Sequence, residues 1–178
     1  MSYEVKTRGI VLRRYPFREK SWILRLYTES EGTLSVLASG RKQAVALPGA
    51  LVHVTLRIRP HREIQRLVEM DWDYIYGHFF HDLERTPYLL LAIEWLSQCL
   101  RAPEGDLFQW LRNQLIALDK ASEPREAILR MLADLLGRLG GMPPSPPYTF
   151  SKVEEAYQHA FPEWKPISSH SLITFAGL

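Results

Sequence analysis

Cysteine is nearly absent from this sequence, since Cys99 is the only one among 178 residues. A single thiol can form no disulfide within the chain, and a zinc ribbon needs four cysteine or histidine ligands at paired spacings. Neither kind of stabilising link is therefore expected. Cys99 lies in the apolar run from Tyr88 to Leu100, where a buried core thiol is the ordinary interpretation.

Common enzyme signatures are also missing. The sequence has no glycine-rich phosphate loop, no HExxH zinc motif and no GxSxG elbow. We accordingly predict a protein that is not an enzyme, with no cofactor, no catalytic residue and no resident metal. One alternative stays open, a metal-dependent hydrolase built on acidic and histidine side chains after the β-rich region. Those residues are Glu69, Asp71, Asp73, His78, His81 and Asp82.

Long apolar runs are absent as well. No stretch approaches the roughly 18 uninterrupted apolar residues of a membrane span. Residues 1–6 lack the apolar region of a signal peptide. We therefore expect a cytoplasmic protein that does not enter a membrane.

Acidic residues are scarce in the first part of the chain, and this scarcity is informative. Residues 1–66 hold 13 Lys and Arg against 5 Glu, a net charge of +8, whereas residues 67–178 hold 9 basic and 15 acidic residues, a net charge of −6. Such asymmetry indicates that the first part binds a polyanion. Arginine outnumbers lysine there by ten to three, which favours nucleic acid because guanidinium bridges phosphates and stacks on bases.

The first seventy-five residues are predicted to form five short strands. Leu51 to Arg59 alternates between an apolar and a polar face, as a half-buried strand does. Gly9 lies where the apolar parity of a strand from Tyr3 to Arg14 changes, which predicts a β-bulge at that glycine. Five strands without a βαβ rhythm indicate a small antiparallel barrel, and the five-stranded OB-fold has the right size.

After the strands, the apolar period becomes helical. Four helices are predicted, over residues 86–100, 106–120, 122–139 and 151–160, with N-caps at Thr86, Asp106, Ser122 and Ser151. The fold class is thus α+β, with an OB barrel followed by a helical bundle. We predict three parts: an OB domain at 1–75, a helical domain at 76–142, and a proline linker, short helix and C-terminal tail at 143–178.

A surface that follows a phosphate backbone needs cations spaced along it, and single strands also need exposed aromatic rings for stacking. The candidate nucleic-acid-binding residues are Arg8, Arg13, Arg14, Arg18, Lys20, Arg25, Arg41, Lys42, Arg57, Arg59, Arg62 and Arg66. Four aromatic residues are interleaved with them, Tyr15, Phe17, Trp22 and Tyr27, and each could instead fill the core. A second class of function also stays open, in which the basic barrel docks on an acidic protein partner.

The order of several short motifs resembles the RecO family of bacterial DNA repair and recombination mediators. In the β-rich part these are Arg8 to Leu12, Glu19, Ser21, Leu26 to Glu29, Gly32, Ala38 to Arg41 and Gly49 to Leu51. In the helical part the run from Tyr88 to Gly141 ends in Leu135 to Gly140. The resemblance covers roughly residues 3–143.

That resemblance implies a function in recombination and the repair of DNA damage. Members bind single-stranded and double-stranded DNA through the OB domain, and they work with the RecR ring and the single-stranded DNA-binding protein. They help to load the RecA recombinase, which makes RecA an indirect partner, and they can anneal complementary strands. They are not hydrolytic, and a nucleoid-associated place in the bacterial cytoplasm is implied.

The sequence departs from the family pattern after the third predicted helix. Many members carry a four-cysteine zinc element there, whereas this chain has the proline-rich stretch from Met142 to Tyr148. The resemblance is therefore to a member without the zinc element. Some members also bind the acidic tail of the single-stranded DNA-binding protein on the helical domain, and Arg125, Arg130 and Arg138 are the candidate residues for that contact here.

Overall fold

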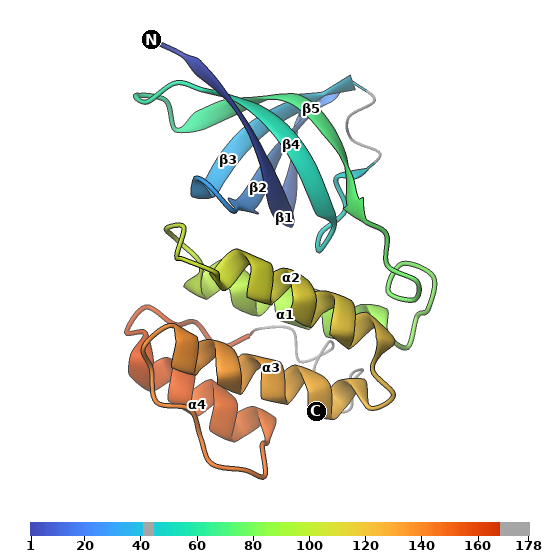
Figure 1. The fold of residues 1–178 in the computed structure, drawn as a ribbon, viewed down its shortest axis with the longest axis vertical. Helices are drawn as coiled ribbons and strands as arrows, with labels where there is room; N and C mark the ends of the chain where they lie inside the picture. The colour runs from blue at the N-terminus through green and yellow to red at the C-terminus, as the bar shows by residue number, and fades with distance from the viewer. Residues whose placement is uncertain (41–44, 168–178) are drawn as a thin grey trace. The chain divides into compact units, whose positions relative to one another are not determined.

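In the computed structural model, which describes residues 1–40 and 45–167, five strands are followed by four helices (Figure 1). The strands are β1 (Tyr3–Arg18), β2 (Ser21–Thr28), β3 (Gly32–Ser39), β4 (Leu51–Ile58) and β5 (Ile64–Tyr74). The helices are α1 (Thr86–Cys99), α2 (Leu107–Lys120), α3 (Pro124–Arg138) and α4 (Phe150–Ala160). The predicted order of a β domain and then helices is confirmed.

The five strands form a closed barrel in the order β1-β2-β3-β5-β4. Closure depends on the length of β1, which pairs with β4 from Tyr3 to Ile10 and with β2 from Gly9 to Arg18. All neighbours are antiparallel except β3 and β5, which run parallel over Ser35–Leu37 and Ile64–Arg66. This arrangement confirms the five-stranded OB-fold expected from the sequence.

A bulge does occur in β1, but not at the predicted place. Gly9 pairs regularly with Thr28 on one side and Val52 on the other. The register shifts instead between Val11 and Arg13, and again further along β1. The prediction at Gly9 was wrong because Ile10, Val11 and Leu12 are all buried, so the parity change falls at the shift itself.

The barrel core comes from the apolar faces of all five strands. Val52, Val54, Leu56 and Ile58 of β4 are buried, as their alternation predicts. Tyr27 of β2 is also completely buried, with its ring centroid 6.2 Å from that of Phe108, so the ring does not belong to a binding surface.

A segment far along the chain belongs to the same compact unit, which comprises Met1–Ile75 and Leu100–Arg112. The Thr33 amide donates to the Arg101 carbonyl at 2.7 Å, and the Thr33 hydroxyl donates to the Leu100 carbonyl at 3.0 Å. Gly32 precedes this contact with φ +71°, and a Cβ there would lie 2.5 Å from the Arg101 oxygen. Only glycine fits both the conformation and the close approach.

The second compact unit comprises Tyr76–Cys99 and the residues from Asn113 onward. Trp95 of α1 is its aromatic centre, with ring centroids 5.1 Å from Tyr157 and 4.9 Å from Trp164. Burial raises the pKa of the Tyr157 phenol, which donates to the Leu132 carbonyl at 2.7 Å. Among the described residues, no helix is long and apolar enough to cross a membrane.

A buried carboxylate holds the chain before α1. Asp119 is completely buried and accepts three backbone N–H bonds, from Gly77 at 2.9 Å, His78 at 3.1 Å and Phe79 at 2.7 Å. Those bonds replace the water that the carboxylate loses on folding. Asp119 therefore fixes the turn that leads into the helical part.

Three predicted N-caps were wrong. Thr86 is itself the first residue of α1, and its hydroxyl donates backwards to the carbonyls of Phe79 and Asp82. Glu123, with no side-chain cap bond, replaces Ser122 before α3, because Pro124 already occupies the first helical position. Thr149 replaces Ser151 before α4, accepting from the Lys152 amide.

Candidate nucleic-acid interface

The barrel carries a groove of about 460 Å³ in which four of the predicted arginines meet. Its lining comes from the end of β1, from β2 and β3, and from β4, β5 and the turn between them. The residues are Phe17, Ser21, Ile23, Leu37, Ser39, Arg57, Arg59, Arg62, Ile64, Gln65 and Arg66. We call this the arginine groove. In OB-folds this face and these loops bind oligonucleotides.

The positive charge in the arginine groove is largely uncompensated. None of the described residues that line it is acidic. Arg57 is bonded to Glu4 of β1, with Nη2 2.6 Å and Nε 3.2 Å from the same carboxylate oxygen. Arg59, Arg62 and Arg66 are exposed, and their guanidinium groups form no ion pair with any other described residue. Three arginines are thus available to an anion.

Gln65 organises the turn that presents two of these arginines. Its Oε1 accepts from the Arg59 amide at 2.7 Å, and its Nε2 donates to the carbonyls of Arg59 at 3.2 Å and Arg62 at 2.6 Å. The Gln65 side chain therefore holds the β4–β5 turn by bonding to the backbone of both Arg59 and Arg62. Sequence reasoning missed Gln65, because a lone glutamine after a turn carries no pattern that distinguishes it from a solvated residue.

Strand register places Arg66 beside apolar residues. Ile23 of β2 is the Cα partner of Leu37 of β3, and Leu37 is the partner of Arg66 of β5. Ile64 is 41% exposed and Phe17 45% exposed, both unusual for large apolar side chains. The groove therefore combines cationic and apolar side chains.

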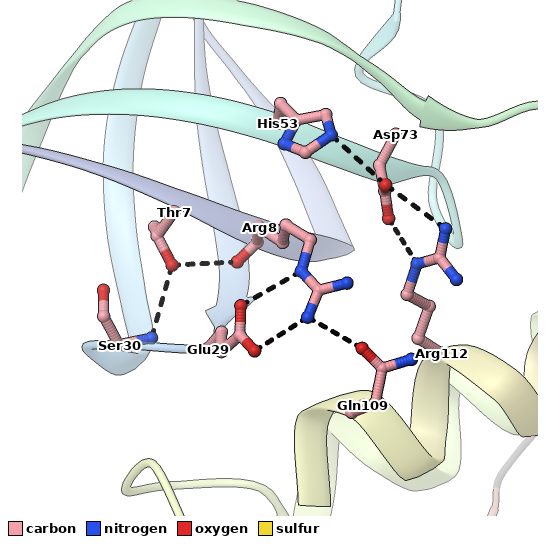
Figure 2. Close-up of polar contacts among 8 residues, drawn as sticks. All are labelled: Thr7, Arg8, Glu29, Ser30, His53, Asp73, Gln109 and Arg112. Atoms are coloured by element: carbon pink, nitrogen blue, oxygen red, sulfur yellow. Dashed lines mark hydrogen bonds and ion pairs between the residues drawn. The ribbon is translucent and has the colours of Figure 1, made fainter. Parts of the chain in front are cut away.

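Arg8 does not belong to the arginine groove, although it was a candidate. Its Nε and Nη2 donate to both oxygens of Glu29 at 3.0 Å and 2.8 Å, and Nη2 also donates to Gln109 at 2.8 Å (Figure 2). The hydrogen bond from Arg8 holds the pKa of the Glu29 carboxyl below its usual value and raises that of Arg8. Arg8 therefore has a structural partner.

The remaining basic candidates are distributed around β1 and β2. Arg13 and Arg25 are Cα partners across the two strands. The Arg14 guanidinium covers the Trp22 ring at 4.2 Å, and the Arg18 guanidinium lies 5.1 Å from the centroid of the Phe17 ring. Lys20 lies in the exposed β1–β2 turn, whereas Arg41 and Lys42 lie outside the described residues.

A second groove on the barrel, of about 690 Å³, has a different charge pattern. It contains Lys6 and Arg8 but also Glu29, Glu69 and Asp71, so its charges nearly cancel. We call it the paired groove. Next to it Asp73, whose side chain is only 7% exposed, accepts from Arg112 at 2.6 Å and 3.3 Å and lies 3.2 Å from His53 Nε2 (Figure 2).

The residues of the barrel match a known protein family. Residues 1–76 match the family described as "Recombination protein O N terminal". The barrel is therefore similar to the N-terminal part of RecO proteins. The predicted resemblance to RecO is thus confirmed over the OB domain.

Curated RecO relatives match beyond the barrel. The DNA repair protein RecO of Phocaeicola vulgatus is 29% identical over 124 residues, covering 65% of this chain and 52% of the relative. That of Chlorobium phaeobacteroides (strain DSM 266) is 29% identical over 127 residues, covering 67% and 49%. That of Thermosynechococcus vestitus is 26% identical over 156 residues, covering 81% and 54%. The chain spans about half the length of the curated relatives it matches.

The acidic and histidine residues weighed above for a metal site have other contacts in the structure. Asp73 bonds to Arg112, and His78 Nδ1 lies 3.5 Å from the buried carboxylate of Asp119. Within the described ranges, no group of three His, Cys, Asp or Glu side chains is placed to hold a metal ion. The hydrolase alternative gains no support from this geometry.

One of the three arginines considered for a partner peptide lines a groove on the helical part. Arg125, Arg130 and Arg138 are all exposed on α3. Arg130 lines a groove of about 360 Å³ with Glu126, Leu129, Pro146, Pro147 and Tyr148, and the other two arginines are not among the residues that line it. That groove therefore contains only one of the three candidate arginines.

Proposed function

We propose that this chain is a RecO-like, non-enzymatic DNA-binding mediator of recombination and repair. It binds single-stranded and double-stranded DNA through the barrel and assists recombinase loading or strand annealing. The observation that carries this proposal is the cluster of Arg59, Arg62 and Arg66 in a groove without acidic lining. The printed name of the relatives, DNA repair protein, supports the same conclusion.

Electrostatics favours a phosphate backbone as the ligand of that groove. Arginine binds phosphate through paired N–H donors and remains charged at all physiological pH values. Each neutralised phosphate releases condensed counterions, so affinity should fall linearly with salt on logarithmic axes, by roughly 0.7 per contact for single strands. The candidate residues elsewhere on β1 and β2 would extend this path around the barrel.

The partners of the proposed function are those that the family resemblance implies. They are RecR, the single-stranded DNA-binding protein and, indirectly, RecA. The helical part would contact the protein partners, with Arg125, Arg130 and Arg138 as the candidate positions for an acidic peptide. We propose that the chain acts in the bacterial cytoplasm at the nucleoid.

The test is fluorescence anisotropy of the full chain with a labelled oligonucleotide between about 50 and 200 mM salt. The groove variant carries Arg59→Gln, Arg62→Gln and Arg66→Gln. Its matched control carries Arg125→Gln, Arg130→Gln and Arg138→Gln, which removes the same charge from α3. We expect the groove variant to lose about two units of salt slope, from three contacts of roughly 0.7 each, and the control to keep the slope of the original chain.

Two results would contradict the proposal. An affinity that does not change with salt would exclude phosphate neutralisation, and equal losses in both variants would show that only overall charge matters. If the chain binds no DNA but retains a protein partner after nuclease treatment, the alternative of a basic barrel docked on an acidic protein would replace it.

A further inference from the structure

Phe17 lies where the pairing of β1 with β2 is interrupted. Pro16 is the Cα partner of Trp22 and Arg18 is the partner of Ser21, so Phe17 falls between two paired positions at a register shift. Such a bulge redirects a side chain relative to the regular alternation of the strand. Here the ring lines the arginine groove and is 45% exposed.

Three further apolar residues line the groove together with this ring. Ile23 and Leu37 are half-buried cross-strand partners, and Ile64 is 41% exposed. A concave surface that combines exposed apolar side chains with uncompensated arginines suits a ligand with flat apolar faces and anionic groups. An unpaired DNA strand has both, whereas a duplex hides the faces of its bases inside the stack.

The other three aromatic candidates for base stacking, Tyr15, Trp22 and Tyr27, have different surroundings from Phe17. Tyr27 is completely buried. The guanidinium of Arg14 covers the Trp22 ring at 4.2 Å, and Tyr15 is 45% exposed but is not among the residues that line the groove. Phe17 is thus the described aromatic residue that lines the arginine groove.

The neighbouring Arg18 contacts the Phe17 ring but leaves it more exposed than Trp22. Its guanidinium lies 5.1 Å from the ring centroid, a cation–π contact that occupies one face of the ring. Because Phe17 is still 45% exposed, ring surface remains for a flat partner. A base stacked there would have Arg59, Arg62 and Arg66 of the same groove available for its phosphates.

We propose that Phe17 is the base-stacking residue of the arginine groove and gives the barrel its preference for unpaired strands over duplex. This inference rests on the DNA-binding function proposed above and adds a specificity-determining residue to it. The arginines act on either form of DNA, because both forms present phosphates. The ring acts only on a strand whose base faces are accessible.

The experiment compares the affinity of the full chain for a labelled single strand and for the corresponding duplex across a salt series. Phe17→Ala removes the ring, Phe17→Leu keeps apolar bulk without a π-face, and Phe17→Trp restores a ring. Tyr15→Ala is the matched control, since it removes an equally exposed aromatic residue of the same strand. Circular dichroism checks that each variant keeps the native fold.

We expect Phe17→Ala and Phe17→Leu to bind the single strand about tenfold more weakly, while duplex affinity stays within about twofold. The salt slope should not change, because stacking releases no counterions. Phe17→Trp should bind the single strand like the original chain, and Tyr15→Ala should leave both affinities unchanged.

The inference is overturned if Phe17→Ala lowers both affinities by the same factor or lowers neither, while the original chain still binds DNA with a steep salt dependence. In that case the proposed function stands and only the stacking role fails. If the original chain binds neither form of DNA, the proposed function itself fails, and the inference fails with it.

Discussion

The arginine groove and the paired groove belong to the same barrel, and both contain basic side chains, but in different surroundings. Arg59, Arg62 and Arg66 lie in a groove whose described lining has no carboxylate. Arg8 lies in a groove that also contains Glu29, Glu69 and Asp71, and it bonds to Glu29. The comparison teaches that a net charge of one sign does not locate a binding surface. What matters is which cations lack an internal partner.

The largest expected effect comes from Asp73, which lies next to the paired groove. Asp73→Ala should lower the stability of the fold and leave DNA binding unchanged. Its carboxylate is almost buried and accepts twice from Arg112. Removing it leaves a partly buried guanidinium without its partner, which we expect to lower the free energy of unfolding by about 2–3 kcal/mol. Urea denaturation measures this loss. A large fall in DNA affinity in the still-folded variant would erase the distinction between the two grooves.

Next in size is the difference between two neighbouring arginines of β4 and its following turn. Arg59→Gln should weaken single-strand binding about fivefold, because it removes one available phosphate contact. Arg57→Gln should have a smaller effect, because Arg57 is already bonded to Glu4. Anisotropy at one low salt concentration ranks the pair, and the reverse order would refute the argument from internal pairing.

Arg8→Gln should lower stability by about 1 kcal/mol at neutral pH, since its ion pair is only partly buried. The effect should depend on pH. Arg8 depresses the pKa of Glu29 below 4.5 in the folded state, so this stabilisation is complete above pH 4.5 and disappears as the pH falls through the folded-state pKa. The stabilities of variant and original chain, measured by denaturation at several pH values, should converge in acid while DNA affinity at neutral pH stays the same.

The smallest effect concerns the one paired cation within the arginine groove. Glu4→Gln should release Arg57, add up to one phosphate contact and raise DNA affinity about twofold, with a salt slope steeper by at most roughly 0.7. The quantity to follow is that slope in the anisotropy titration. A weaker complex would mean that Glu4 positions Arg57 for the ligand instead of competing with it.

The barrel could be predicted because the sequence patterns that indicate it come from residues close together in the chain. The alternation from Leu51 to Arg59 and the spacing of short strands depend on residues close in sequence, and the structure confirms the fold. The parity change in β1 was visible too, but only the register with β2 shows which residue leaves the ladder.

The ion pairs could not be predicted, because they depend on register across long separations. Arg8 meets Glu29 across 21 positions and Gln109 across 101, and Arg57 meets Glu4 across 53. No periodicity connects such residues. The sequence therefore locates the basic region but cannot separate Arg8 from the arginines whose guanidinium groups form no ion pair among the described residues.

The hydrogen bonds between Thr33 and the segment at Leu100–Arg101 have a consequence for a barrel that is produced without the rest of the chain. An uncovered strand edge offers backbone donors and acceptors to any other chain, which is a common route to aggregation. A fragment that ends at Ile75 would expose this edge of β3 and would also remove Phe108, whose ring lies 6.2 Å from that of Tyr27. We therefore expect such a fragment to self-associate more readily than the full chain, in which the later segment covers this edge.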